Sequence, residues 1–162
     1  MQKLSIWSIE VELFNWLELN IPKNSNFLEI GSGEATPFLL KNWNLTSIEE
    51  SIEWVNKYHN NYIYAPIKNN WYDLDIIKKK LPTDILTILV DGPAYGERNG
   101  FFKNIDFFLT LNPKFIIFDD VHRHEDRICY DSVINYLNNK NIKIETDIIK
   151  NEKAFAYIKI KE

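Results

Sequence analysis

The sequence has 162 residues, of which 45% are hydrophobic and 14% aromatic, and its formal net charge at pH 7 is −4. We expect residues 1–162 to form a single domain with a core of its own and a lead-in helix within residues 1–20. The charge argues against a nucleic-acid partner, because phosphate binding needs clustered Lys and Arg and the basic residues here are spread along the chain.

Neither a membrane segment nor an export signal is predicted from the sequence. The apolar runs fall short of the ~20 residues that a membrane helix needs, and acidic residues occur throughout the N-terminal segment, unlike in a signal peptide. The single cysteine, Cys129, excludes an internal disulfide and a multi-cysteine zinc site. We therefore expect a cytoplasmic protein with no membrane partner.

Short apolar runs alternate with amphipathic stretches along the chain, a pattern typical of β-α units. Strands are expected at 26–30, 46–49, 62–65, 85–90, 114–118, 143–149 and 154–160. Helices are expected at 7–19, 37–43, 51–60, 72–80, 104–111 and 126–138. The last two strands are joined by a short connection and should pair antiparallel. The fold class predicted is α/β, with a doubly wound, mostly parallel seven-stranded sheet that ends in a C-terminal antiparallel hairpin.

A glycine loop, EIGSGEA, follows the first expected strand. Gly31 and Gly33, on either side of Ser32, let the backbone turn tightly and approach a ligand. Ala35 comes two positions after Gly33, whereas the dinucleotide fingerprint has its third glycine three positions after the second. A carboxylate at Glu29 would repel a pyrophosphate and suits an ammonium or sulfonium cation. The loop therefore favours S-adenosylmethionine over a nicotinamide cofactor.

A second acidic position lies at a suitable distance from this loop. Glu49 follows Gly31 by 18 residues and ends the second expected strand, close to the ~20-residue spacing at which an acidic residue binds ribose hydroxyls. Glu50 is the alternative in register. A glycine turn without a ligand, followed by two surface glutamates, is the other interpretation; Glu29, the strand context and Glu49 together favour a cofactor site.

The segment LEIGSGEAT resembles the first motif of class I S-adenosylmethionine-dependent methyltransferases, and SIEES resembles their acidic second motif. This resemblance implies a Rossmann-like methyltransferase fold, in which the glycine loop lines the methionine end of the cofactor and Glu49 binds its ribose. Family members contact the adenine from the loop after the third strand, where Pro66 lies.

Charged loops also follow the fourth and fifth expected strands. The first contains Asp91, and the second contains Asp119, Asp120 and His122. Ligands of open parallel sheets bind at the carboxyl ends of the strands, so we expect these residues beside the glycine loop. Methyl transfer to oxygen requires alignment of the acceptor and removal of its hydroxyl proton, and Asp91, Asp120 and His122 are the catalytic candidates.

The same residues are candidates for a metal site. Oxygen atoms from Asp91, Asp119 and Asp120 suit a hard divalent cation such as Mg²⁺, and His122 would suit a softer one. The alternative is structural: Asp91 caps a helix or bonds the loop backbone, and Asp120 is an N-cap. A bound metal is the less favoured of the two.

The segments VDGPAYGERNG and FDDVHRHED resemble the paired motifs of glucuronoxylan O-methyltransferases and related sugar-modifying proteins, within a resemblance that spans 27–127. The matching residues are Asp91, Gly92, Pro93, Arg98, Asp120, Val121 and Arg123. The last acidic position of the motif is matched imperfectly, by Glu125 one position early or by Asp126, and the chain is much shorter than the plant enzymes. Metal-dependent catechol-type methyltransferases also resemble it in part, with Asp120 here in place of their Asn.

Three residues of these loops are candidates for acceptor binding. Arg98 and Arg123 could clamp an acceptor carboxylate of the kind that a uronic acid offers, or form salt bridges with the nearby acids. Tyr95 could stack on a sugar ring.

These features predict a methyltransferase that modifies an oxygen of a small-molecule or glycan acceptor. One rival is a non-catalytic S-adenosylmethionine-binding or interaction module, which the short chain leaves open. A nicotinamide-dependent oxidoreductase is the other, and the glycine spacing, Glu29 and the terminal hairpin count against it. Because the sequence contains no large lid, the acceptor site is either open or completed by a second subunit in a homodimer.

Overall fold

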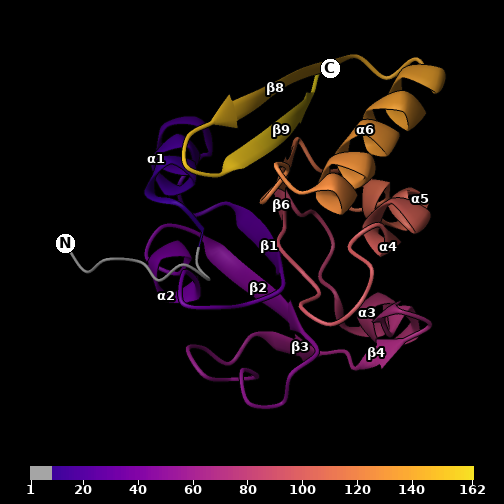
Figure 1. Cartoon of the computed structure of the whole chain (residues 1–162). Coiled ribbons are helices and arrows are strands. Elements are labelled where there is room, and N and C mark those ends of the chain that lie inside the picture. Colours follow the sequence, from indigo (N-terminus) through magenta and orange to yellow (C-terminus); the bar gives the residue numbers. More distant parts are fainter. Residues whose placement is uncertain (1–8) are drawn as a thin grey trace.

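The computed structural model describes residues 9–162, in which helices cover both faces of one seven-stranded sheet (Figure 1). The strands of this sheet are β1 (Asn26–Ile30), β2 (Asn44–Glu49), β3 (Tyr62–Tyr64), β6 (Thr87–Val90), β7 (Phe115–Phe118), β8 (Ile144–Lys150) and β9 (Ala154–Ile160). A separate two-stranded hairpin consists of β4 (Ile67–Lys68) and β5 (Trp71–Tyr72). The helices are α1 (Val11–Asn20), α2 (Thr36–Leu39), α3 (Leu74–Lys80), α4 (Gly100–Lys103), α5 (Ile105–Leu109) and α6 (His124–Asn139).

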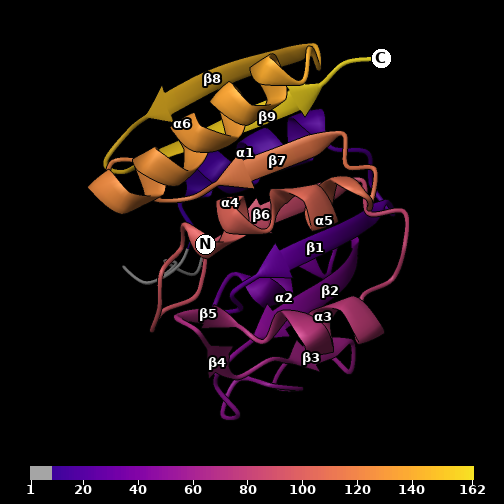
Figure 2. The same ribbon diagram turned by 90° about the vertical axis from the view of Figure 1, so that its right-hand side faces the viewer.

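The strand order is β3-β2-β1-β6-β7-β9-β8, which Figure 2 shows from bottom to top. The first five strands in this order are parallel, while β9 runs antiparallel to both β7 and β8. The carboxyl ends of β1, β2, β6 and β7 therefore meet at one edge of the sheet. The predicted mostly parallel sheet with a C-terminal antiparallel hairpin is confirmed.

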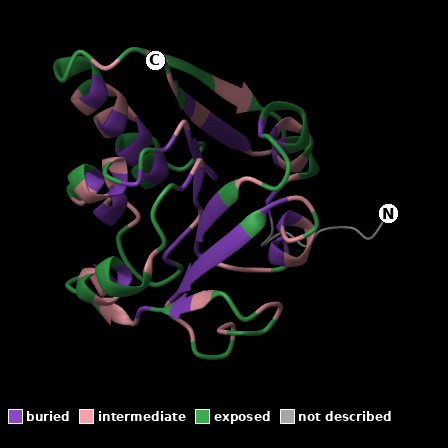
Figure 3. Cartoon of the chain, turned by 180° about the vertical axis from the view of Figure 1, so that it is seen from behind, coloured by how far each residue is buried: buried purple, intermediate pink, exposed green. Residues whose placement is uncertain are grey.

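Alternate residues of the central strands pack into two separate parts of the core. Phe27 and Leu89 pack with residues of α1 and α2, whereas Leu28 and Ile88 pack with residues of α3 to α6 on the other face. The central strands are buried on both faces, and the edge strand β8 is largely exposed (Figure 3). This double burial is why the central strands are continuous apolar runs.

The prediction of a helix at 51–60 is wrong. The segment forms successive turns, in which the Ser51 carbonyl accepts bonds from the Trp54 and Val55 amides. Asn56 has a positive φ of 58°, and Ile52 is 67% exposed. A left-handed residue interrupts a helix, and without a buried apolar stripe the segment has little tertiary packing to stabilise one.

The helix expected at 72–80 begins later, because Tyr72 belongs to β5. Asn69 and Asn70 both have positive φ values and form the turn between β4 and β5, a conformation that asparagine tolerates well. The side chain of Asp73 then accepts hydrogen bonds from the Asp75 and Ile76 amides and caps α3.

Other helices also differ in their bounds from the expectation. The helix expected at 104–111 is shortened to α5, and the unpredicted α4 precedes it. Helix α2 is much shorter than the predicted 37–43. The lead-in helix starts at Val11; the part of it predicted before residue 9 lies outside the described residues. No helix within residues 9–162 combines the length and apolar character needed to cross a membrane.

Candidate functional site

The two glycines of the loop after β1 have different environments. Gly31 has a φ of 90°, and a Cβ atom there would lie 2.7 Å from the Asp91 carbonyl oxygen, so the close contact between two strand ends requires glycine. A Cβ atom on Gly33 would meet nothing within 4 Å. Gly31 is therefore needed by the fold itself, whereas the missing side chain of Gly33 leaves open space above the loop.

The carboxyl group of Glu29 lies beneath the glycine loop and is only 2% exposed. It accepts hydrogen bonds from Thr36 Oγ1, at 2.8 and 3.0 Å, and from Ser47 Oγ at 2.7 Å. Thr36 Oγ1 also accepts a bond from the Gly33 amide, so Glu29 supports the loop through Thr36. Burial raises the pKa of Glu29 to about 8, although the Ser47 and Thr36 hydroxyls oppose the rise.

Glu49, at the end of β2, is bonded directly to the glycine loop. Its Oε2 atom accepts hydrogen bonds from the Ser32 amide at 3.0 Å and the Ser32 hydroxyl at 2.6 Å, and its Oε1 atom accepts one from the Ser51 amide. The structure thus brings together the two motifs that the sequence placed 18 residues apart. Burial raises the pKa of Glu49, and the Ser32 and Ser51 hydrogen bonds oppose this rise.

Glu50 faces the loop that follows β6. Its Oε1 atom accepts hydrogen bonds from the Ala94 amide at 2.9 Å and the Tyr95 amide at 3.4 Å, so it holds this loop beside β2. The Tyr95 side chain is 81% exposed. Pro66, predicted near the adenine, accepts a bond from the Asp73 amide through its carbonyl group. Neither Tyr95 nor Pro66 lines the cavity described next.

A cavity of about 570 Å³ opens at the carboxyl edge of the sheet. One end is formed by the glycine loop, with Ser32 and Gly33, and the other by the loops after β6 and β7. Its lining includes the predicted residues Asp91, Arg98, Asp119, Asp120 and Arg123. The structure therefore brings Asp91, Asp120, Arg98 and Arg123 into one cavity with the glycine loop.

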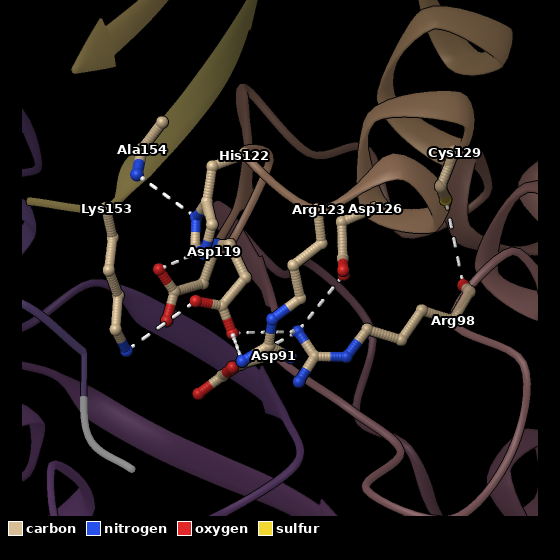
Figure 4. Close-up of polar contacts among 10 residues, drawn as sticks. Asp91, Arg98, Asp119, His122, Arg123, Asp126, Cys129, Lys153 and Ala154 are labelled. Atoms are coloured by element: carbon tan, nitrogen blue, oxygen red, sulfur yellow. Dashed lines mark hydrogen bonds and ion pairs between the residues drawn. The ribbon is translucent and has the colours of Figure 1, made fainter. Parts of the chain in front are cut away.

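Arg98 is at the centre of an acidic cluster in this cavity (Figure 4). Its Nη1 atom lies 3.2 Å from Asp126 Oδ1 and 3.4 Å from Asp91 Oδ1, and 3.7 Å from Asp120 Oδ2. Arg123 Nη2 approaches Asp120 Oδ2 to 3.0 Å. Both arginines therefore form salt bridges with the acids, which was one of the two roles left open for them.

The acids of the cluster have unusual proton affinities. Burial and the neighbouring Asp119 raise the pKa of Asp91 well above its usual range, and Arg98 opposes this rise. Burial and the adjacent Asp120 raise the pKa of Asp119 to about 7. Carboxyl groups with raised pKa values in a cavity are suited to accept and release protons near neutral pH.

Oxygen atoms of Asp91, Asp119 and Asp120 all lie within 4.8 Å of one another, so the three predicted metal ligands are brought together. Arg98 and Lys153 already compensate the charge of these acids, because Lys153 Nζ lies 3.6 Å from Asp120 Oδ1. A divalent cation would compete with these groups for the same oxygens, which disfavours a bound metal. Asp91, Asp119 and Asp120 remain the residues that would hold one.

His122 is bonded to the terminal hairpin. Its Nδ1 atom accepts a hydrogen bond from the Ala154 amide at 3.3 Å, and the residue lines a neighbouring cavity instead of the one that holds Asp91. Of the three catalytic candidates, only Asp91 and Asp120 therefore line the cavity beside the glycine loop.

Sequence patterns missed three residues of the site. Trp54 lines the cavity from the segment that was predicted to be a helix, and Lys153 lines it from the turn of the terminal hairpin. Asp126, one of the two acids left open at the end of the motif, pairs with Arg98. Tyr72 is buried with its hydroxyl near Gly92, and that hydroxyl has no hydrogen-bond partner among the described residues.

Comparisons with known proteins identify the architecture. By sequence, the chain matches no protein-family model and no curated protein. Its structure is similar to that of an O-methyltransferase from Bacillus cereus in complex with SAH, with a TM-score of 0.69 and 15% identity over 98% of this chain and 84% of that one. The fold is that of the Rossmann-like methyltransferases.

Two further structures share this fold. A SAM-dependent methyltransferase from Aquifex aeolicus has a TM-score of 0.55 and 15% identity, over 96% of this chain and 91% of that one. The METTL16 methyltransferase domain has a TM-score of 0.60 and 10% identity, over 98% of this chain and 69% of that one. At these identities the similarity concerns the fold, and the function must be argued from the site.

Proposed function

We propose that this protein is an S-adenosylmethionine-dependent methyltransferase that acts on an oxygen of a small-molecule or carbohydrate-like acceptor. The observation that carries this proposal is the cavity that joins the open face of Gly33 to Asp91. A cofactor against the glycine loop and an acceptor at Asp91 would then occupy one continuous space. The methyltransferase fold supports the same assignment.

Three groups of the chain fit this cofactor. The bare backbone at Gly33 leaves room for close approach, and Glu49 has a carboxylate at the end of β2 for the ribose hydroxyls. The unpartnered Tyr72 hydroxyl is a buried donor close to the glycine and Asp91 loops. A dinucleotide fits less well, because Ala35 comes two positions after Gly33, whereas the dinucleotide fingerprint has its third glycine three positions after the second.

S-adenosylmethionine supplies an activated methyl group when it is bound. The chain then has to orient the acceptor and remove its hydroxyl proton. Asp91 takes that proton, since it lines the cavity and its pKa is raised. Arg98 acts on Asp91 as a positioning residue through their salt bridge, and Asp120 holds Arg98 and Arg123 in place.

Substitution of the two glycines separates folding from cofactor binding. Gly31→Ala forces a Cβ atom against the Asp91 backbone at a positive φ and should lower the free energy of unfolding by roughly 2–4 kcal/mol. Gly33→Ala should leave that free energy within about 0.5 kcal/mol of the wild-type value but weaken S-adenosylmethionine binding. Urea unfolding and calorimetric titration measure the two effects; equal destabilisation by both substitutions would contradict the difference in their environments.

Glu49→Ala should weaken binding of S-adenosylmethionine by roughly 1–3 kcal/mol, about 5- to 150-fold, because the ribose hydroxyls lose a charged acceptor. Glu53→Ala is a matched control, because Glu53 is exposed shortly after Glu49 in the chain and its substitution removes the same charge. Calorimetric titration of both variants measures the difference. Equal affinities of the two variants would mean that Glu49 serves only to hold Ser32.

Tyr72→Phe tests the buried hydroxyl. Burial, with the Glu50 and Glu49 carboxylates nearby, raises the pKa of Tyr72 well above its usual value, so the hydroxyl remains a donor. Removal of an unpartnered hydroxyl should change the unfolding free energy little. Weaker binding of S-adenosylmethionine, with an unchanged melting temperature, is the expected result; a marked loss of stability would instead indicate that the hydroxyl is bonded within the protein.

A further inference from the structure

A second cavity, of about 540 Å³, lies between the start of α6 and the turn of the β8–β9 hairpin. Its lining is strongly basic: His122, Arg123, His124, Arg127, Lys150 and Lys153. Among the described residues that line it, Glu152 is the only acid. In a chain with a net charge of −4, such a concentration of cationic groups attracts anions to one place.

One residue of the lining, His122, has a ring nitrogen that is left as a donor. Because His122 Nδ1 accepts from the Ala154 amide, the hydrogen of the neutral ring is on Nε2, which is left as a donor. The sixteen-residue helix α6 begins at this cavity without a side-chain cap at Arg123. Its dipole adds positive potential to that of the basic side chains.

The nearby acids neutralise only part of this charge. Arg127 pairs with Asp131 at 3.0 Å, while Arg123 and Lys153 share the single carboxylate of Asp120 with Arg98. Within residues 9–162, Lys150 makes no salt bridge. The lining therefore holds four Lys and Arg side chains against one acid, Glu152.

The basic cavity adjoins the cavity that holds Asp91. Arg123, His124 and Lys153 line both, and Arg123 and Lys153 each form a salt bridge with Asp120, which lines the cavity of Asp91. A single acceptor molecule could therefore place a hydroxyl group near Asp91 and an anionic group among the basic side chains.

We propose that the basic cavity binds a phosphoryl group of the methyl acceptor, which makes the acceptor a phosphorylated hydroxyl compound. This rests on the proposed methyltransferase function. A phosphate monoester carries nearly two negative charges and three acceptor oxygens, which suits a lining of two histidines, two arginines and two lysines better than a carboxylate does. The basic groups lie in one cavity and form no extended stripe, which favours a small molecule over a nucleic acid.

The test uses phenyl phosphate and benzoate as probes, titrated calorimetrically into the full chain with and without SAH. Phenyl phosphate should bind at least several-fold more tightly than benzoate. Lys150→Gln and Arg127→Gln should each weaken its binding about tenfold and leave SAH binding unchanged. Lys143→Gln, an exposed lysine just before β8, is the matched control and should change neither affinity.

The outcomes separate this proposal from the proposed function. SAH binding without phenyl phosphate binding, or equal affinity for benzoate, overturns the phosphoryl site and leaves the methyltransferase assignment intact. If the wild type does not bind SAH, the methyltransferase assignment is contradicted, whether or not phenyl phosphate binds. A short single-stranded oligonucleotide that binds more tightly than phenyl phosphate, and does so through Lys150 and Arg127, overturns the small-molecule acceptor.

Discussion

Asp91→Asn is expected to lower the rate of methyl transfer by roughly 10²- to 10⁴-fold, the usual contribution of a positioned proton acceptor. Asparagine keeps the size of the side chain but cannot take a proton from an acceptor hydroxyl. The rate is measured by transfer of a labelled methyl group from S-adenosylmethionine to phosphorylated and unphosphorylated hydroxyl compounds. Affinity for SAH should stay within a few-fold of the wild-type value, because the proposed cofactor contacts are Gly33, Glu49 and Tyr72.

The pH dependence gives a second test of Asp91. Because its pKa is raised by burial and by Asp119, the wild-type rate should increase with pH as the carboxyl group loses its proton. In Asp91→Asn this increase should be absent. Asp75→Asn, on the exposed side of α3, is the matched control and should keep both rate and pH profile. A fully active Asp91→Asn variant would assign proton removal to another group.

Glu29→Gln is expected to remove a large part of the pH dependence of stability. The pKa of Glu29 is about 8 in the folded state and near 4.5 when unfolded. Between these values the folded state holds a proton that the unfolded state has lost, so the unfolding free energy falls as the pH rises. The shift corresponds to roughly 5 kcal/mol, at about 1.4 kcal/mol per pKa unit. This stability is complete below pH 4.5 and is lost as the pH approaches 8.

Urea unfolding of wild type and Glu29→Gln across this pH range measures the effect. The wild type should lose stability steeply with rising pH, and the variant should lose less, since Glu29 no longer adds to the raised pKa values of Asp91, Asp119, Asp126 and Glu49. Glu34→Gln changes an exposed residue of the same loop and should keep the wild-type slope. Parallel curves for wild type and Glu29→Gln would show that Glu29 is ionised in the folded protein.

Much of the fold could be predicted because burial on both faces leaves a clear sequence signal. The apolar runs around Ile88 and Ile116 and the short connection before Ala154 were enough to predict a parallel sheet with a reversed last strand. The segment 51–60 has a helix-like sequence, but its side chains find no apolar surface to pack on, and that depends on the tertiary structure. The Asn69–Asn70 turn is a local signal that could have shown Tyr72 to lie in a hairpin.

The site was predictable where its residues are adjacent in sequence to strand ends. Gly31, Glu49 and Asp91 follow β1, β2 and β6, and the carboxyl ends of parallel strands lie together. The pairing of Arg98 with Asp126 was not predictable, because a loop and a helix meet only in the folded chain. The salt bridge between Lys153 and Asp120 was not predictable for the same reason, because Lys153 lies in the turn of the terminal hairpin.

Calorimetric titration of the wild-type chain with S-adenosylmethionine and with SAH tests the central proposal most directly. Both compounds should bind to one site per chain with dissociation constants well below millimolar, and Glu49→Ala and Gly33→Ala should weaken both. Absence of binding at millimolar concentrations of either compound, by a chain that is folded under the same conditions, would contradict the assignment of this protein as a methyltransferase.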